Sequence, residues 1–83
     1  MEEIKAGVYK HFKGRFSNVI GVAKHSDREE MLVIYKGLND GGLYARPVES
    51  FLDIVDDKQG NKVPRFAPAT ETELEQLKKD GLI

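Results

Sequence analysis

Closely spaced turn signals divide this chain into short runs of β-forming residues. Clusters rich in Gly, Asn, Asp and Lys occur at residues 13–15, 37–42 and 56–61, and Pro47 and Pro64 interrupt two further runs. Segments of about four to eight residues between such turns are typical of strands, whereas helices need about ten or more. The spacing therefore predicts a mainly β fold.

Val, Ile, Tyr and Phe are concentrated between these turns, as expected for strands. The expected strands cover about residues 7–12, 16–25, 31–35, 43–46 and 62–66. Residues 48–55 fit both helical and strand spacing, and we favour a short helical turn that leads into a strand. Because Pro64 has no amide hydrogen to donate, we expect the last strand at a sheet edge.

The second and third strands are expected to form a hairpin with its tip at residues 27–28. In this register Val22 lies opposite Val33, and Ile20 lies opposite Tyr35. A glycine within the second strand indicates a bend of the kind that suits a closed barrel.

The C-terminal segment has the pattern of a helix. Thr70 and Glu73 have the spacing of a capping box, and the basic residues of the segment come near its end. Leu74 and Leu77 form only a narrow apolar stripe, so we expect this helix to pack less firmly than the strands.

A chain of 83 residues supports one small domain. We expect residues 1–83 to form a single domain, with the β-barrel over residues 6–67 and the helix over residues 70–80. The absence of cysteine excludes disulfides, thiolate metal sites and thiol nucleophiles. The acidic start and the lack of a long apolar stretch predict a cytoplasmic protein with no membrane partner.

Charge is unevenly distributed along the chain. Residues 1–25 carry five basic and two acidic side chains, whereas the remainder carries eight basic and twelve acidic ones, for a net charge of −1. Most sequence-independent nucleic-acid binders have a positive field over the whole protein, which this composition does not supply. Nucleic acid is therefore not the favoured partner.

Several short motifs combine aromatic, basic and turn-forming residues in a fixed order. They are Tyr9-x-His11-Phe12-Lys13-Gly14, Val19-x-Gly21-x-Ala23-x-His25-Ser26, Val33-x-Tyr35, Arg46-Pro47, Phe51 and Pro64-Arg65-Phe66. In this order, over roughly residues 8–66, they resemble DUF1653, a family of small bacterial domains of unknown function. The resemblance implies an SH3-like small barrel and brings no established activity with it. With the strand and helix patterns, the expected fold is a small SH3-like barrel of about five antiparallel strands with a C-terminal helix.

Seven side chains are candidates for a ligand-binding surface: Tyr9, His11, His25, Tyr35, Tyr44, Arg46 and Arg65. The tyrosines would supply flat contact area, and the arginines would bind a carboxylate, a phosphate or a carbonyl group. The histidines would add pH-sensitive hydrogen bonds. This set predicts a non-enzymatic binding module for a peptide or a small anionic ligand, without a cofactor or a metal.

A structural role for the same residues is the main alternative. In that interpretation Arg46 and Arg65 pair with nearby carboxylates of Glu49, Asp53 or Asp56, and the tyrosines cover the core.

Two further functions stay open. RNA binding would use the basic residues of the N-terminal region and would depend steeply on salt; these residues are Lys10, Lys13, Arg15 and Lys24. A small hydrolase or metal-dependent enzyme would require His11 and His25 to meet a carboxylate such as Glu30. Two histidines 14 positions apart, without cysteine, are a weak signal for such a site.

Overall fold

The structure, a computed structural model, describes residues 4–83 and confirms a mainly β fold with a C-terminal helix. Its elements are β1 (Gly7–His11), β2 (Phe16–Lys24), β3 (Met31–Gly37), β4 (Leu43–Pro47), α1 (Val48–Phe51), β5 (Ile54–Asp56), β6 (Lys62–Pro64), β7 (Phe66–Pro68) and α2 (Glu71–Lys79). The expected last strand is split at Arg65 into β6 and β7, which pair with different partners.

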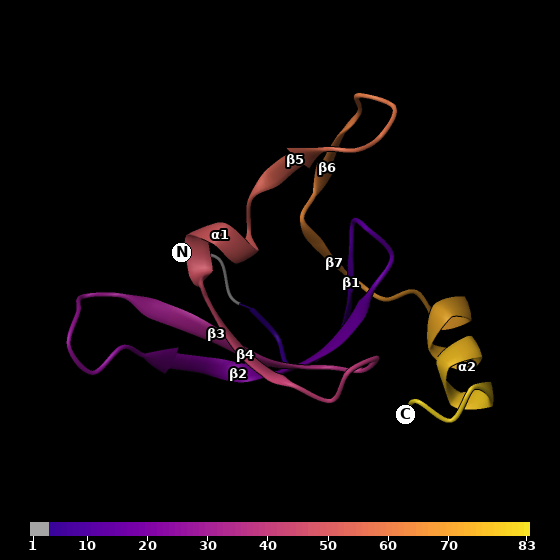
Figure 1. Cartoon of the computed structure of the whole chain (residues 1–83), viewed down its shortest axis with the longest axis horizontal. Coiled ribbons are helices and arrows are strands. Elements are labelled where there is room, and N and C mark those ends of the chain that lie inside the picture. Colours follow the sequence, from indigo (N-terminus) through magenta and orange to yellow (C-terminus); the bar gives the residue numbers. More distant parts are fainter. Residues whose placement is uncertain (1–3) are drawn as a thin grey trace.

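Five strands form one antiparallel sheet in the order β4-β3-β2-β1-β7, and β5 and β6 form a separate hairpin that projects from it (Figure 1). The expected closed barrel is not seen, because no backbone pairing within residues 4–83 joins the edge strands β4 and β7. These edges instead approach through side chains, since the Arg46 guanidinium carbon lies 5.4 Å from the centre of the Phe66 ring.

The β2–β3 hairpin follows the expected register only near its tip. Val22 pairs with Val33 as expected, but Tyr35 pairs with Val19, because a register shift lies between Val19 and Gly21. The prediction that Ile20 faces Tyr35 is therefore wrong. The shift leaves Ile20 57% exposed and buries Val19 in the core. An extra residue of this kind adds bend and twist to a strand.

The core lies on the inner face of the sheet and consists of Val19, Val33, Tyr35, Phe51 and Phe66. Residues 48–55 form a short helix followed by a strand, as expected. The helix α1 begins directly after Pro47 and lies over the sheet (Figure 1), and its Phe51 belongs to the core. The Phe51 ring stacks on Phe66 at 4.4 Å between centroids. Through Phe51, α1 therefore packs against β7 at one edge of the sheet.

α2 lies against the opposite face of the sheet from this core. Thr70 caps the helix through the expected capping box with Glu73. The Glu73 carboxylate also forms an ion pair with Lys10 Nζ at 3.0 Å. Lys10 alternates with Tyr9 and His11 along β1, so its side chain points away from the inner face. Leu77 is only 3% exposed. The ion pair between Lys10 and Glu73 therefore joins α2 to β1. Within residues 4–83, neither α1 nor α2 is long and apolar enough to cross a membrane.

Candidate functional site

A cleft of about 330 Å³ opens on the inner face of the sheet, next to the core. We call it the Arg46 cleft, and its principal lining side chains are those of His11, Arg15, Ser17, Tyr35, Tyr44 and Arg46. They come from β1, β2, β3, β4 and the turn between β1 and β2.

Strand register explains why these residues meet. Tyr35 pairs directly with Tyr44, and Arg46 lies opposite Val33, so all four side chains point to the inner face. Ser17 lies on the same face because it pairs with Tyr9 of β1. The cleft therefore continues the core toward the end of the sheet where the β1–β2 turn and the β3–β4 loop meet.

Two stacked tyrosines form one wall of the cleft. The rings of Tyr35 and Tyr44 lie 5.4 Å apart with an interplanar angle of 20°. The Tyr44 hydroxyl donates to Asp40 of the β3–β4 loop, which raises the pKa of Tyr44 and lowers the pKa of the Asp40 carboxyl. Asp40 also accepts the Gly42 amide at 2.9 Å. Tyr44 is 43% exposed but held in position by this loop.

Arg46 lies in the cleft without a carboxylate partner. Its Nη1 donates to Ser50 Oγ at 3.0 Å, and its Nε makes a longer contact with the Tyr35 hydroxyl at 3.4 Å. Neither Arg46 nor Arg15 forms an ion pair with any carboxylate of residues 4–83. Two guanidinium groups therefore give the cleft a local positive charge in a protein whose net charge is −1.

Two buried polar side chains complete the lining. His11 is 7% exposed and Ser17 is 6% exposed. His11 Nδ1 accepts the Lys13 amide at 3.2 Å, so the neutral imidazole carries its proton on Nε2. Within residues 4–83 neither His11 Nε2 nor Ser17 Oγ forms a side-chain hydrogen bond, but neither atom is fully buried, since Arg65 Nε is the one fully buried side-chain nitrogen or oxygen without a partner there. A group in the cleft can accept a hydrogen bond from each of them.

Burial lowers the pKa of His11 below its ordinary value of 6.5. The positive charges of Arg15, Arg46, Arg65 and Lys13 lower it further, in that order of effect. The imidazole is therefore neutral at pH 7.

Four of the seven predicted side chains line the cleft: His11, Tyr35, Tyr44 and Arg46. Tyr9 lies elsewhere, with its ring edge-on to Phe51 at 5.3 Å and its hydroxyl donating to the Lys5 carbonyl. Tyr9 therefore covers the core, as the structural interpretation expects.

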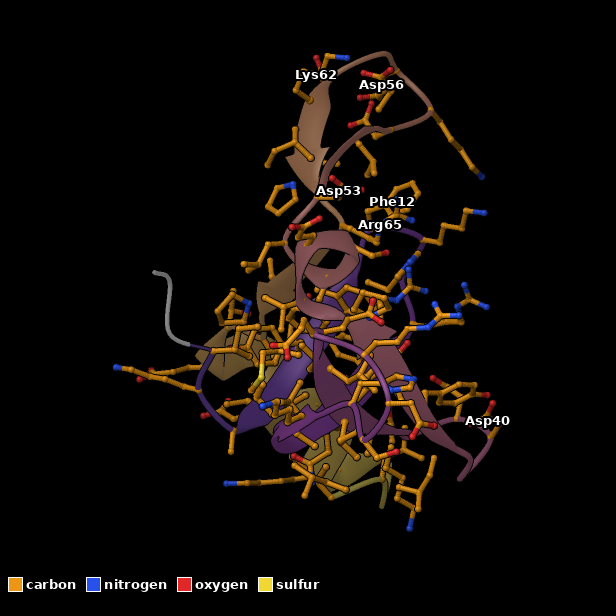
Figure 2. All side chains as sticks on the ribbon, turned by 90° about the vertical axis from the view of Figure 1, so that its left-hand side faces the viewer. Phe12, Asp40, Asp53, Asp56, Lys62 and Arg65 are labelled. Carbon is orange, nitrogen blue, oxygen red and sulfur yellow. The ribbon has the colours of Figure 1, made fainter. Side chains whose placement is uncertain are left out.

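Arg65 lies beside the cleft rather than in it. Its Nη2 is 3.6 Å from Asp53, and Figure 2 shows the two side chains at the base of the β5–β6 hairpin. Arg65 Nε is buried without a hydrogen-bonding partner in residues 4–83. The structural interpretation thus fits Arg65, which pairs with a carboxylate, and does not fit Arg46.

His25 lies far from His11, at the other end of β2. The His11 amide donates to the carbonyl of Arg15, which directly precedes β2, so His11 lies beside the start of that strand. His25 directly follows the last residue of β2. Eight residue steps along a strand span roughly 26 Å. His25 also lies opposite Glu30, as expected, but only through the backbone, and its Nδ1 accepts the Asp27 amide. The two histidines therefore share no site, and no cluster of three metal-binding side chains occurs in residues 4–83.

The basic side chains expected for RNA binding do not share a surface. Lys10 pairs with Glu73 on the outer face, and Arg15 lines the cleft on the inner face. Lys24 lies at the far end of β2.

The sequence did not single out Ser17, Asp40 or Phe66 as site residues, and it placed Arg15 in the turn at residues 13–15, where the structure also has it, exposed but lining the cleft. Ser17 was detectable by counting alternate positions along the second strand. Asp40 was not, because its role depends on how the β3–β4 loop folds back toward Tyr44.

Comparison with known proteins places the chain in a family. No curated protein matches it. The crystal structure of a DUF1653 protein from Bordetella bronchiseptica matches with a TM-score of 0.75 and 29% identity, over 83% of this chain and 91% of that one. The sequence profile of DUF1653, described as a protein of unknown function, matches residues 7–68, which include every strand of the sheet and the lining of the Arg46 cleft. The chain therefore belongs to the DUF1653 family.

Proposed function

We propose that the Arg46 cleft binds a small anionic ligand and that the chain acts as a non-enzymatic binding module. The observation that supports this most is the Arg46 guanidinium, which lines a cleft without a carboxylate partner in residues 4–83. Arg46 is half-buried, and an opposite charge offsets the free energy that partial removal of water from an unpaired charge costs. An anion in the cleft would supply that partner.

The neighbouring groups support the same proposal. His11 Nε2 and the Ser17 hydroxyl belong to residues that are largely buried, form no side-chain hydrogen bond within residues 4–83, and can donate to a ligand in the cleft. The Tyr35–Tyr44 stack offers a flat apolar wall beside them. The ligand that fits best therefore carries both an anionic group and a flat ring.

A small ligand fits better than a peptide. The cleft has a volume of about 330 Å³, which is in the range of small-molecule sites. A peptide strand would instead pair with a free sheet edge, at β4 or β7. RNA binding is supported less, because its expected basic residues are spread over both faces.

The SH3-like assignment is also part of this proposal. The sheet is open at the backbone level, but Arg46 of β4 and Phe66 of β7 bring its two edges together across the cleft. We regard the fold as a small barrel completed by side chains. A ligand between these edges would take the place of the missing strand pairing.

Calorimetric titration with phenyl phosphate and with benzoate tests the binding proposal. We expect saturable binding of at least one of them at one site per chain. The variant Arg46→Gln should bind about 10- to 100-fold more weakly, because a hydrogen bond to a charged group contributes about 1.5–3 kcal/mol.

Arg28→Gln is the matched control, because it removes the same charge from the exposed tip of the β2–β3 hairpin. It should bind as the unchanged protein does. Arg46→Gln also loses contacts with Ser50 and Phe66, so its amide NMR spectrum must show that it remains folded. Equal binding by a folded Arg46→Gln variant, or no binding by the unchanged protein, would contradict the proposal.

A further inference from the structure

We propose that the anionic group bound in the Arg46 cleft is a phosphate monoester, and that His11 takes up a proton when it binds. The inference rests on the proposed function, and it adds the chemical class of the ligand and a pH dependence of the site.

The charges of the lining favour a dianion. Arg15 and Arg46 line the cleft and Lys13 is a further cation near His11, which gives three positive charges without a carboxylate partner in residues 4–83. Asp40 is the one acidic side chain among the lining residues, and it keeps its negative charge because its partners, the Tyr44 hydroxyl and the Gly42 amide, are neutral. These four side chains sum to a charge of +2, so a ligand carboxylate would compensate half of it, whereas a phosphate monoester carries about two negative charges near neutral pH.

The directions of the donors favour a tetrahedral group. His11 reaches the cleft from the end of β1, Ser17 from β2, Arg46 from β4, and Arg15 from the β1–β2 turn. A carboxylate has two oxygens in one plane, which suits a single guanidinium. A phosphate monoester has three free oxygens that point in different directions, which suits donors from several strands.

The surroundings of His11 couple binding to proton uptake. Four cations lower the pKa of His11, namely Lys13 and Arg15 from the turn, Arg46 from β4 and Arg65 from the segment between β6 and β7, while Asp40 is the acidic side chain of the same cleft. Its other neighbours are the rings of Phe12 and Phe66. Without a ligand these cations and burial keep the imidazole neutral. A dianion would offset the cations, so the protonated ring would become favourable and would donate from Nε2.

Three ring compounds separate the charge of the ligand from its shape. Phenyl phosphate is mostly a dianion at pH 7.5, phenyl sulfate has the same tetrahedral shape with one negative charge, and benzoate is planar with one negative charge. We expect phenyl phosphate to bind at least about tenfold more tightly than the other two in calorimetric titrations at pH 7.5. Equal affinities would overturn the assignment of a phosphate monoester but leave anion binding intact.

Phenyl sulfate does not titrate between pH 5.5 and 7.5. A pH dependence of its binding in this range therefore reports protonation of the protein and not of the ligand. Histidine is the side chain that ordinarily titrates in this range. The affinity of the protein for phenyl sulfate should rise at least about threefold as the pH falls from 7.5 to 5.5. A ligand that binds the protonated form more tightly is bound together with uptake of a proton. His11→Asn should show no such rise, and it keeps an acceptor for the Lys13 amide.

His25→Asn is the control, because His25 lies at the opposite end of β2 and should leave the pH dependence unchanged. NMR of the His11 ring supplies a direct measurement, since its pKa should be higher with phenyl phosphate bound. A pH-independent affinity for phenyl sulfate, with an unchanged His11 pKa, would overturn the proton uptake. If none of the three compounds binds, the proposed function itself fails.

Discussion

His11 is the residue whose surroundings most alter its chemistry. Burial and four nearby cations lower its pKa in the folded protein from 6.5, whereas in the unfolded chain it titrates near its ordinary value. The unfolded chain therefore binds a proton more readily once the pH falls below about 6.5. The contribution of His11 to stability is complete above that pH and is lost as the pH falls toward its folded-state pKa.

This linkage gives a stability prediction. Between pH 7.5 and pH 5.5 the free energy of unfolding should decrease more for the unchanged protein than for His11→Asn, as measured by urea denaturation at both pH values. His25→Asn should follow the unchanged protein. The same pH dependence with and without His11 would show that its ring is not desolvated as described.

Gly37 allows the β3–β4 loop to hold Tyr44. A Cβ at position 37 would overlap the Asp40 carboxylate, so Gly37→Ala must displace the group that accepts the Tyr44 hydroxyl. We expect a lower free energy of unfolding than that of the unchanged protein in urea denaturation, because the hydrogen bonds of Asp40 are weakened. The pKa of Tyr44, raised above 10.0 by Asp40, should fall back toward that value in NMR titrations.

Gly21→Ala provides the comparison for this substitution. A Cβ at Gly21 meets nothing within 4 Å, so Ala should be neutral or slightly stabilising there. If Gly21→Ala and Gly37→Ala have equal effects, the close approach of Asp40 does not control the loop.

Individual side chains were predictable from sequence where alternation decides their direction. Because side chains alternate along a strand, the expected strand at residues 7–12 has Tyr9 and His11 on one face, and in the structure both lie on the inner face, although only His11 reaches the cleft. Alternation could not distinguish Arg46, which has no carboxylate partner, from Arg65, which pairs with Asp53. That difference depends on where the β5–β6 hairpin places Asp53, which no local pattern specifies.

At the scale of elements, helix α2 has the clearest local signals. Thr70→Ala removes the side chain that accepts the Glu73 amide at 3.2 Å, and loss of such a cap typically costs about 1 kcal/mol. We expect amide hydrogens of α2 to exchange about fivefold faster, while those of β2 and β3 are unaffected. Thr72 lies within the same helix and makes no capping bond, so Thr72→Ala should change amide hydrogen exchange much less. Equal acceleration by both variants would contradict the role of the cap.

Strand positions were predictable from the turn signals, but two features of the strands were not. The register shift between Val19 and Gly21 changed the partner of Tyr35, because an extra residue in a strand depends on which side chains the core accepts. The break at Arg65 likewise follows from partners distant in sequence. Its amide bonds to the Asp53 carbonyl in the β5–β6 hairpin, whereas Phe66 pairs with His11 of β1.

At the scale of the molecule, the cleft arises because the sheet is open. Its edge strands β4 and β7 meet through the Arg46 guanidinium and the Phe66 ring rather than through backbone hydrogen bonds. Sequence patterns predicted a barrel because the strand count, the turns and the family resemblance all suit one. The edge strands β4 and β7 pair only if the curvature of the sheet brings their backbones close enough for hydrogen bonds. Local sequence patterns do not specify that distance.

The most direct test of the account is an amide-resolved NMR titration of the full chain with phenyl phosphate. We predict saturable shifts that cluster at the cleft, at His11, Arg15, Ser17, Tyr44 and Arg46, with little change at His25 and along α2. Shifts that are absent, that do not saturate, or that centre on the outer face near Lys10 and α2 would contradict the claim that the Arg46 cleft is the binding site.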